Sequence, residues 1–545
     1  MKLYCLIFAC FTALVATHSC MLTSTSAPFD FDDPEINALL NQETNLNITR
    51  QTDKQDIITL LLDIGAINLL KQPIFLRTNK LNTRSLLDYP LFLRFKKPKR
   101  CLGIDLFYNV TARKFFNKDS SNISSYLNIT GEGFISALEN IFTQLKDLLP
   151  NFDPEFFSTL PLLFENFTVE ERRFGLMFYG TKHVDKYQIT VMVPWYYLER
   201  NHFVDQAQQD IIEETIADAQ KRISGQAPSP ESVCNDAVEQ FQDLHLISDK
   251  FGLGDSRIMI DMPWIEKRDW ELRIGTYFTI PSAFCMTKGL KGNNFKPPVI
   301  RPTVNLLDLI NQALNAGDFT ETEIYNFILG ALDNLGAMIL EEPIGNGGHL
   351  GVAVYSRSAT PLRNWVNLWW TKHFTWNSFM SIEYLFPKQE QRFFITCNDE
   401  NEFDTRDFTN PNQANSNFDF LTRKLTERLY PYAYYATVHP GFIFRSTSNF
   451  TYERKKGGFA LGTDTYVKLA ERLHNIKICD QLETPLNKKV ATKPLVYQSK
   501  LYGSFFWKHK QLNRSWVFSL NLDSTWTTSG IGPDYMATFK CDVCF

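Results

Sequence analysis

After its first twenty residues, the sequence lacks any apolar run long enough to cross a bilayer as a helix. Residues 57–70 come nearest, but Asp63, Gly65 and Asn68 interrupt a segment already shorter than the about 18 residues that a span needs. A bundle of membrane helices is therefore excluded. The chain also lacks a basic surplus, with 56 Lys and Arg against 60 Asp and Glu, so nucleic acid is not expected as a partner.

Cysteine is sparse and irregularly spaced. After residue 20 it occurs at 101, 234, 285, 397, 479, 541 and 544. This spacing matches neither a small disulfide scaffold nor a zinc site, and we expect no metal and no cofactor. Cys541 and Cys544 resemble a redox pair only superficially, because positions three apart on a strand face opposite sides. We expect both to be ordinary strand residues.

Aromatic residues, by contrast, make up 14% of the chain, and most of the sequence alternates between apolar and polar positions. In residues 101–110, for example, Leu102, Ile104 and Leu106 oppose Asp105 and Asn109. A half-buried soluble sheet would also alternate. Here, however, the alternating segments run to about 9–13 residues and often begin or end in Trp, Tyr or Phe, as strands that cross a membrane do.

Charged residues fall in the middle of these segments, and almost always on the polar face. Such a face must be turned away from lipid, and the backbone of every strand must be paired, so the strands must close into a barrel. We therefore predict that the polar face lines the barrel interior. The candidate pore-lining residues are Asp105, Arg173, Arg257, Asp261, Arg273, Arg357, Arg445 and Asp464.

The last eleven residues, YMATFKCDVCF, keep the alternation to the final Phe, with Tyr535, Phe539, Val543 and Phe545 on one face. This ending resembles the C-terminal strand of bacterial outer-membrane β-barrel proteins. The resemblance implies that these four residues form a signal for the outer-membrane assembly machinery. It also implies contact with outer-membrane lipid and a location in the outer membrane of a Gram-negative-type bacterium. It indicates no subfamily.

The predicted fold class is an all-β membrane protein, an antiparallel transmembrane β-barrel of about 14 strands (range 12–16) over residues 72–545. Residues 1–19 read as a signal peptide, and residues 20–71 as an N-terminal helical segment that plugs the lumen or lies in the periplasm. Helical periodicity predicts insertions at about 130–150, 203–248 and 302–341.

One segment decides the topology. In residues 366–386 the apolar residues stay mostly at even positions, whereas a two-residue hairpin turn would move them to odd positions. We therefore predict one strand of about 21 residues with no hairpin at Trp376–Asn377. A weak first strand is expected near Ile74–Lys80. The short links then fall on one side of the barrel and the long links on the other, except the short link at 527–533.

The mixed charges of the predicted interior favour a channel or transporter for small solutes. The alternative for each inward charge is a cross-strand pair that only holds the wall. A surface protein whose helical loops bind a partner is a second hypothesis. A hydrolase is a third, with His373 predicted to lie mid-strand and to face inward, but no local nucleophile motif accompanies it. A secreted pore-former is a fourth, which the alternation up to Phe545 opposes.

Deletion of Phe545 is expected to reduce insertion of the barrel into the outer membrane, because it removes the last residue of the proposed assembly signal. Insertion can be measured on gels as the fraction of membrane protein whose mobility changes on heating. Unchanged insertion would contradict the resemblance on which the signal rests.

Overall fold

The structure is a computed structural model that describes residues 100–111, 168–203, 247–267, 270–286, 344–366, 368–369, 371–396, 403, 405–478, 485–511, 514–529 and 531–545. The proposed signal peptide, the segment 20–71 and the weak first strand lie outside these residues. So do the helical insertions, apart from Phe203, Ile247 and Ser248, which belong to strands. Among the described residues, no helix is long and apolar enough to span a bilayer.

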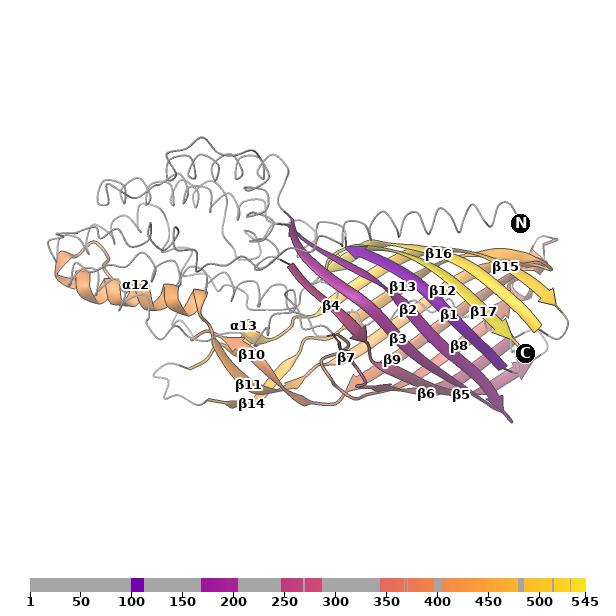
Figure 1. Cartoon of the computed structure of the whole chain (residues 1–545), viewed down its shortest axis with the longest axis horizontal. Coiled ribbons are helices and arrows are strands. Elements are labelled where there is room, and N and C mark those ends of the chain that lie inside the picture. The colour runs from indigo at the N-terminus through magenta and orange to yellow at the C-terminus, as the bar shows by residue number, and fades with distance from the viewer. Residues whose placement is uncertain are drawn as a thin grey trace, which may run out of the picture.

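The alternating segments form an antiparallel sheet that closes on itself (Figure 1). In chain order, the strands of the closed ring are β1 (Arg100–Thr111), β2 (Thr168–Val184), β3 (Tyr187–Phe203), β5 (Ser256–Lys267), β6 (Trp270–Ile280), β8 (Gly351–Pro361), β9 (Phe374–Leu385), β12 (Phe442–Arg454), β13 (Gly457–Lys468), β15 (Val496–Gln511), β16 (Arg514–Ser529) and β17 (Asp534–Cys544). The first strand of the ring pairs with the last, since β1 lies between β2 and β17.

The predicted closed antiparallel barrel is therefore confirmed. In the described part of the chain the ring has 12 strands, within the predicted range but two fewer than 14. The short strands β4 (Ile247–Leu253) and β7 (Phe284–Cys285) belong to the same sheet but extend from β3 outside the ring.

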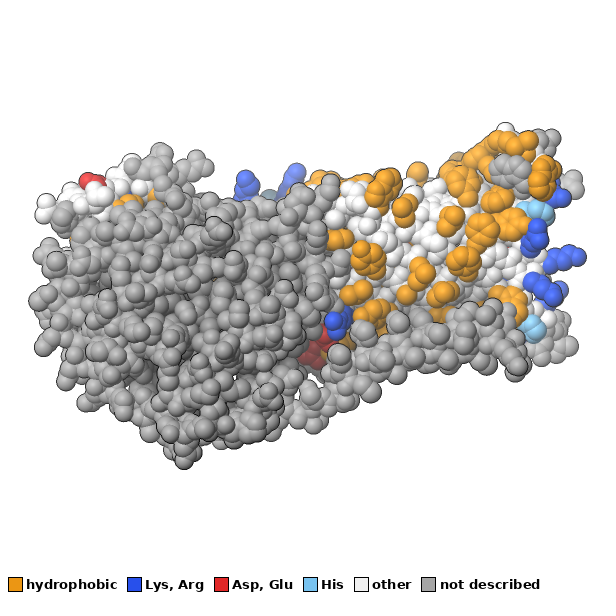
Figure 2. Space-filling model, turned by 90° about the horizontal axis from the view of Figure 1, so that it is seen from above, with side chains coloured by type: hydrophobic (Ala, Val, Ile, Leu, Met, Phe, Trp, Pro, Cys, Tyr) orange, Lys and Arg blue, Asp and Glu red, His pale blue; other side chains and the backbone are white. Residues whose placement is uncertain are grey.

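The alternation sorts side chains between the two faces of the wall as expected. Outward residues such as Leu102 and Phe505 are more than 60% exposed, whereas the inward Asp464 and Lys500 are at most 1% exposed. Apolar side chains are spread over the outer wall, and the visible charged side chains gather near the ends of the barrel (Figure 2). An apolar outside around a polar inside is the arrangement of a membrane-spanning barrel.

The prediction of one long strand over 366–386 is wrong. Strand β9 begins at Phe374, after a loop that contains two short 3-10 helices, η3 (Leu362–Asn364) and η4 (Thr371–His373). The Thr371 hydroxyl donates to the carbonyls of Val366 and Leu368, both at 2.7 Å, and closes a tight turn there. The apolar–polar alternation of residues 366–373 thus belongs to a compact turn and not to a strand. The absence of a hairpin at Trp376–Asn377 is confirmed, because β9 runs through both residues.

The links between strands follow the predicted asymmetry. Short turns join β2 to β3, β5 to β6, β12 to β13 and β15 to β16, and the twelve-residue loop 362–373 joins β8 to β9 at the same end. The chain ends at this end of the barrel as well (Figure 1). We call it the short-turn end and the opposite one the long-loop end, where the link from β16 to β17 is the short exception.

A second, smaller sheet lies beyond the long-loop end. It consists of β10 (Lys388–Phe394), β11 (Tyr432–His439) and β14 (Arg472–Lys477), in the order β10-β11-β14. The helix α12 (Ala414–Leu429) connects β10 to β11 after the 3-10 helix η5 (Pro411–Gln413), and the short helix α13 (Lys488–Ala491) precedes β15. Neither this sheet nor α12 was predicted from the alternation.

Cys544 is not an ordinary strand residue, because it forms a disulfide with Cys101 across the β1–β17 seam. The two residues are register partners at the short-turn end, with their Cα atoms 4.2 Å apart. The adjacent Phe545 N–H donates to the Arg100 carbonyl at 2.9 Å. The spacing between Cys541 and Cys544 was uninformative, because the partner lies 443 residues earlier in the sequence.

Replacing both Cys101 and Cys544 with Ser is expected to lower the stability of the barrel by on the order of 4 kcal/mol, because the disulfide closes a very long loop. The measurement is the urea midpoint of the protein refolded in lipid vesicles, compared with oxidised wild type. Cys541→Ala, which alters a free cysteine on the same strand, is the matched control. Equal midpoints for the double variant and the wild type would contradict a stabilising role.

Candidate functional site in the barrel interior

All eight predicted pore-lining residues lie on strands of the ring, and their side chains are buried. Each of them forms an ion pair with a partner on the same or another strand. The pairs are Asp105–Lys540, Arg173–Glu171, Arg257–Glu383, Arg273–Asp261, Arg357–Asp261 and Arg445–Asp464. A cross-strand pair is thus present at seven of these eight positions, whereas Arg173 pairs with Glu171 on its own strand, β2. A role in solute passage stays a prediction.

Asp261 is the centre of one cluster on the inner wall. Its carboxylate accepts hydrogen bonds from Arg273, from Arg357 Nη2 at 2.9 Å and from the Tyr355 hydroxyl at 2.7 Å. Gly275 leaves the room for this contact, since a Cβ atom there would lie 2.7 Å from the Tyr355 ring. One carboxylate therefore joins three strands, β5, β6 and β8.

Glu383 organises the neighbouring part of the wall. It accepts hydrogen bonds from the Thr279 hydroxyl at 2.6 Å and the Tyr277 hydroxyl at 3.2 Å, and its Oε2 atom lies 3.6 Å from Arg257. The Arg257 guanidinium also lies over the Tyr277 ring, 4.2 Å from its centroid. Such a stack favours a cation that is removed from water.

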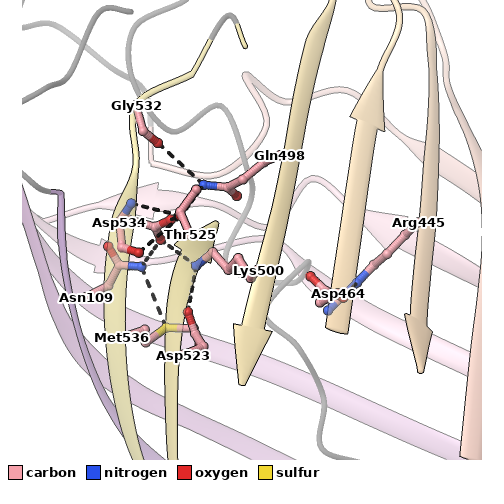
Figure 3. Close-up of polar contacts among 10 residues, drawn as sticks. All are labelled: Asn109, Arg445, Asp464, Gln498, Lys500, Asp523, Thr525, Gly532, Asp534 and Met536. Carbon is pink, nitrogen blue, oxygen red and sulfur yellow. Dashed lines mark hydrogen bonds and ion pairs between the residues drawn. The ribbon is translucent and has the colours of Figure 1, made fainter. Parts of the chain in front are cut away.

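A third cluster surrounds Lys500 on the opposite part of the ring, where β15, β16, β17 and β1 meet (Figure 3). The Lys500 ammonium donates to Asp534 at 2.6 Å and to Asp523 at 2.9 Å. Asp534 also accepts from Asn109 and Gln498, both at 2.7 Å. In the same view, Arg445 reaches Asp464 on the adjacent strands β12 and β13 at 3.0 Å.

The clusters differ in charge. The Asp261 and Glu383 clusters together contain three arginines and three carboxylates, those of Asp261, Glu271 and Glu383, so their net charge is zero. The described buried charges of the wall formed by β1, β15, β16 and β17 are two lysines, Lys500 and Lys540, and four carboxylates. These carboxylates are Asp105, Asp523, Asp534 and Asp542. This side of the interior therefore carries a local excess of two negative charges.

Several members of these clusters were missed as candidates, although the sequence carried the signal. Glu383, Lys500 and Asp523 occupy the polar parity of their segments and lie mid-strand, like the eight residues that were selected. Glu171 was missed for a different reason, because β2 extends to Thr168, beyond the segment recognised from its alternation. It binds Arg173 and Arg200, each at 2.6 Å.

The assembly-signal residues lie where the alternation placed them. Tyr535 and Phe545 are about half exposed on the outer face, and Phe539 and Val543 share that face. The residues of β17 on the opposite face, Met536, Thr538, Lys540 and Asp542, are buried. Their function as a signal stays a prediction. The placement of His373 was wrong, because this residue lies in η4 at the short-turn end, with its ring against Tyr452.

An ionic network joins the barrel to the second sheet at the long-loop end. His349, just before β8, pairs with Glu390 of β10 at 2.6 Å, and Arg392 of β10 pairs with both Glu390 and Glu471. Burial opposes the charge of Glu390, but the Arg392 guanidinium and the His349 hydrogen bond outweigh it and lower the pKa of Glu390 to about 2. Glu471 also binds Lys468, at the end of β13. The second sheet is therefore tied to the rim by the hydrogen bond between His349 and Glu390 and by the ion pair between Lys468 and Glu471.

No protein-family model matches this chain. No curated protein matches it either. The solved structures that resemble it include an outer-membrane channel from Pseudomonas putida F1, at 6% identity and a TM-score of 0.38, covering 84% of this chain and 99% of the other. The toluene transporter TbuX of Ralstonia pickettii gives 8% identity and a TM-score of 0.29, covering 83% and 90%. These likenesses are too distant to bear on the function.

The architecture itself defines the class of the protein. A closed antiparallel ring with an apolar outside, a polar inside and short turns at one end is a transmembrane β-barrel of the outer-membrane type. The sequence-based prediction of this class is confirmed.

Asp261→Asn is expected to destabilise the barrel by about 3 kcal/mol, because it leaves Arg273 and Arg357 buried beside a neutral amide. The urea midpoint in vesicles measures this loss. Asp419→Asn, which removes an exposed carboxylate on α12, is the matched control and is expected to leave the midpoint unchanged. A midpoint for Asp261→Asn equal to that of the control would show that the cluster contributes little to the wall.

Proposed function

We propose that the protein is an outer-membrane channel or transporter for small solutes. The single observation that carries the proposal is the charged inner wall of a 12-stranded ring. Stability alone does not require such a wall, because buried ion pairs can often be replaced by well-packed apolar residues without loss. A barrel that served only as an anchor would therefore gain little from keeping it.

The size of the ring supports this proposal. Eight strands enclose a space that side chains fill, and sixteen to eighteen leave an aqueous channel. In a ring of 12 strands, inward side chains decide how much of the lumen is open. Here the large inward residues Tyr277, Tyr355 and Tyr466 are at most 2% exposed. Neighbouring atoms thus cover these rings almost completely, and we infer that the free space at their level is small and that solutes which pass are small.

A role in surface binding is the second candidate. It is favoured by the folded unit of β10, β11, β14 and α12, which the ionic network holds at the long-loop end. A barrel that only conducts solutes does not need this unit. The two functions are compatible, since one uses the interior and the other the outer surface.

Reconstitution of the purified protein into planar bilayers is expected to give discrete conductance steps. Because four carboxylates oppose two lysines on one wall, we expect a modest preference for cations, measured as the reversal potential in a KCl gradient. Asp523→Asn should reduce this preference, whereas Asp419→Asn should not. Absence of any conductance step would contradict an open channel and leave surface binding as the better candidate.

A further inference from the structure

The short-turn end carries exposed positive charge on one side of the rim. Three turns that are neighbours in the ring contribute it, because β9 pairs with β12 and β13 pairs with β15. The exposed cations of these turns, which we call the basic arc, are Arg363, Lys372, Arg454, Lys455, Lys456, Lys510 and Arg514. Lys and Arg side chains stand out at this end of the barrel in Figure 2.

The three turns that carry the basic arc contain almost no acidic residues. The three turns contain a single acid, Glu453, and it forms an ion pair with Lys508, which is not part of the arc. Elsewhere at the same end the exposed cations are Arg100, Lys182, Lys186 and Lys267, and Asp185 and Glu266 in the adjoining turns partly offset them. The excess of positive charge is therefore largest on the side of the arc.

Apolar and aromatic side chains lie next to the arc. In the loop 362–373, Trp365 is 56% exposed and Trp369 is 83% exposed, between Arg363 and Lys372 in sequence. Trp365 packs against Trp376 of β9, with ring centroids 5.1 Å apart. The Trp365 ring thus extends the aromatic surface of the wall toward the rim, and the exposed Trp369 follows in the same loop.

A group of rings on β9, β12 and β13 completes this surface. Tyr452 lies 5.1 Å from Phe374 and 5.4 Å from Phe459, measured between ring centroids, and the Arg454 guanidinium lies over the Tyr452 ring at 5.5 Å. Cations above a belt of aromatic rings are arranged as at a membrane–water boundary, where rings lie at headgroup level and basic side chains reach the phosphates.

We propose that the basic arc binds the headgroups of anionic phospholipids in the leaflet at the short-turn end, with Trp365 and Trp369 inserted among them. Two observations favour lipid as the occupant. The aromatic surface is continuous with the wall that lies in the bilayer, and the three turns that carry the arc contain seven exposed cations and a single acid. The proposal does not depend on whether the barrel interior conducts solutes.

The test uses the folded protein in vesicles of phosphatidylcholine and phosphatidylglycerol, with bromine on the chains of one lipid at a time. Bromine quenches the fluorescence of nearby Trp, so the two quenching curves give the relative affinity for the two headgroups. We expect wild type to prefer phosphatidylglycerol by at least roughly five-fold, as about 1 kcal/mol for a cation at an anionic surface implies. High salt should weaken this preference.

The variant Lys455→Gln/Lys456→Gln/Lys510→Gln removes three charges of the arc and should bring the preference close to one. Lys182→Gln/Lys186→Gln/Lys267→Gln removes three exposed lysines elsewhere at the same end and should leave it unchanged. An equal loss in both triple variants would overturn the proposal, because it would show a response to net charge alone. Heat-modifiable mobility confirms that each variant is folded.

Two further results bear on the source of the ligand and on the loop. Inorganic phosphate added to the vesicles should not remove the preference, and its removal at millimolar phosphate would indicate an ordinary anion site and overturn the assignment to lipid. Trp365→Phe/Trp369→Phe should reduce the quenching amplitude in anionic vesicles. An unchanged amplitude would contradict insertion of the loop 362–373.

Discussion

The structure depends first on the lack of hydrogen-bonding partners for a backbone in hydrocarbon. Every N–H and C=O group of a strand that crosses the bilayer must find a partner on a neighbouring strand, and an open sheet leaves two edges without one. The pairing of β1 with β17 supplies these partners where the first and last strands of the ring meet. The Cys101–Cys544 disulfide and the hydrogen bond from Phe545 to Arg100 lie at this same seam.

Closure in turn determines what the interior contains. Side chains of a strand point alternately to its two faces. Once the apolar face of each strand is toward lipid, the remaining side chains therefore point into the barrel. Charged groups on that face are removed from bulk water and are tolerated only with partners. The ion pairs of Arg273, Arg445 and Lys500 are therefore a consequence of the ring as well as a means of holding it.

The sequence alone predicted what depends on local period, and this covers the barrel, its polar interior and the placement of the last strand. It failed where a loop has the same apolar–polar alternation as a strand. Residues 362–373 show this alternation, but they form a loop that hydrogen bonds of Thr371 close. It also failed where a partner is distant in sequence. Nothing near Cys544 indicates Cys101, and the Asp261 cluster requires a strand order that one sequence does not contain.

The inner clusters bond strands that are not neighbours, and this explains how they shape the lumen. Arg357 on β8 reaches Gln188 on β3 at 2.6 Å, although β6 and β5 lie between them in the ring. Gln498 on β15 reaches Asp534 on β17 across β16 in the same way. Such bonds run as chords inside the curved wall, so they fix its curvature and occupy the lumen at the same time. If the barrel conducts solutes as proposed, a side chain that holds the wall is also one that a passing solute must meet, and the structural and the proposed pore-lining roles then follow from one geometry.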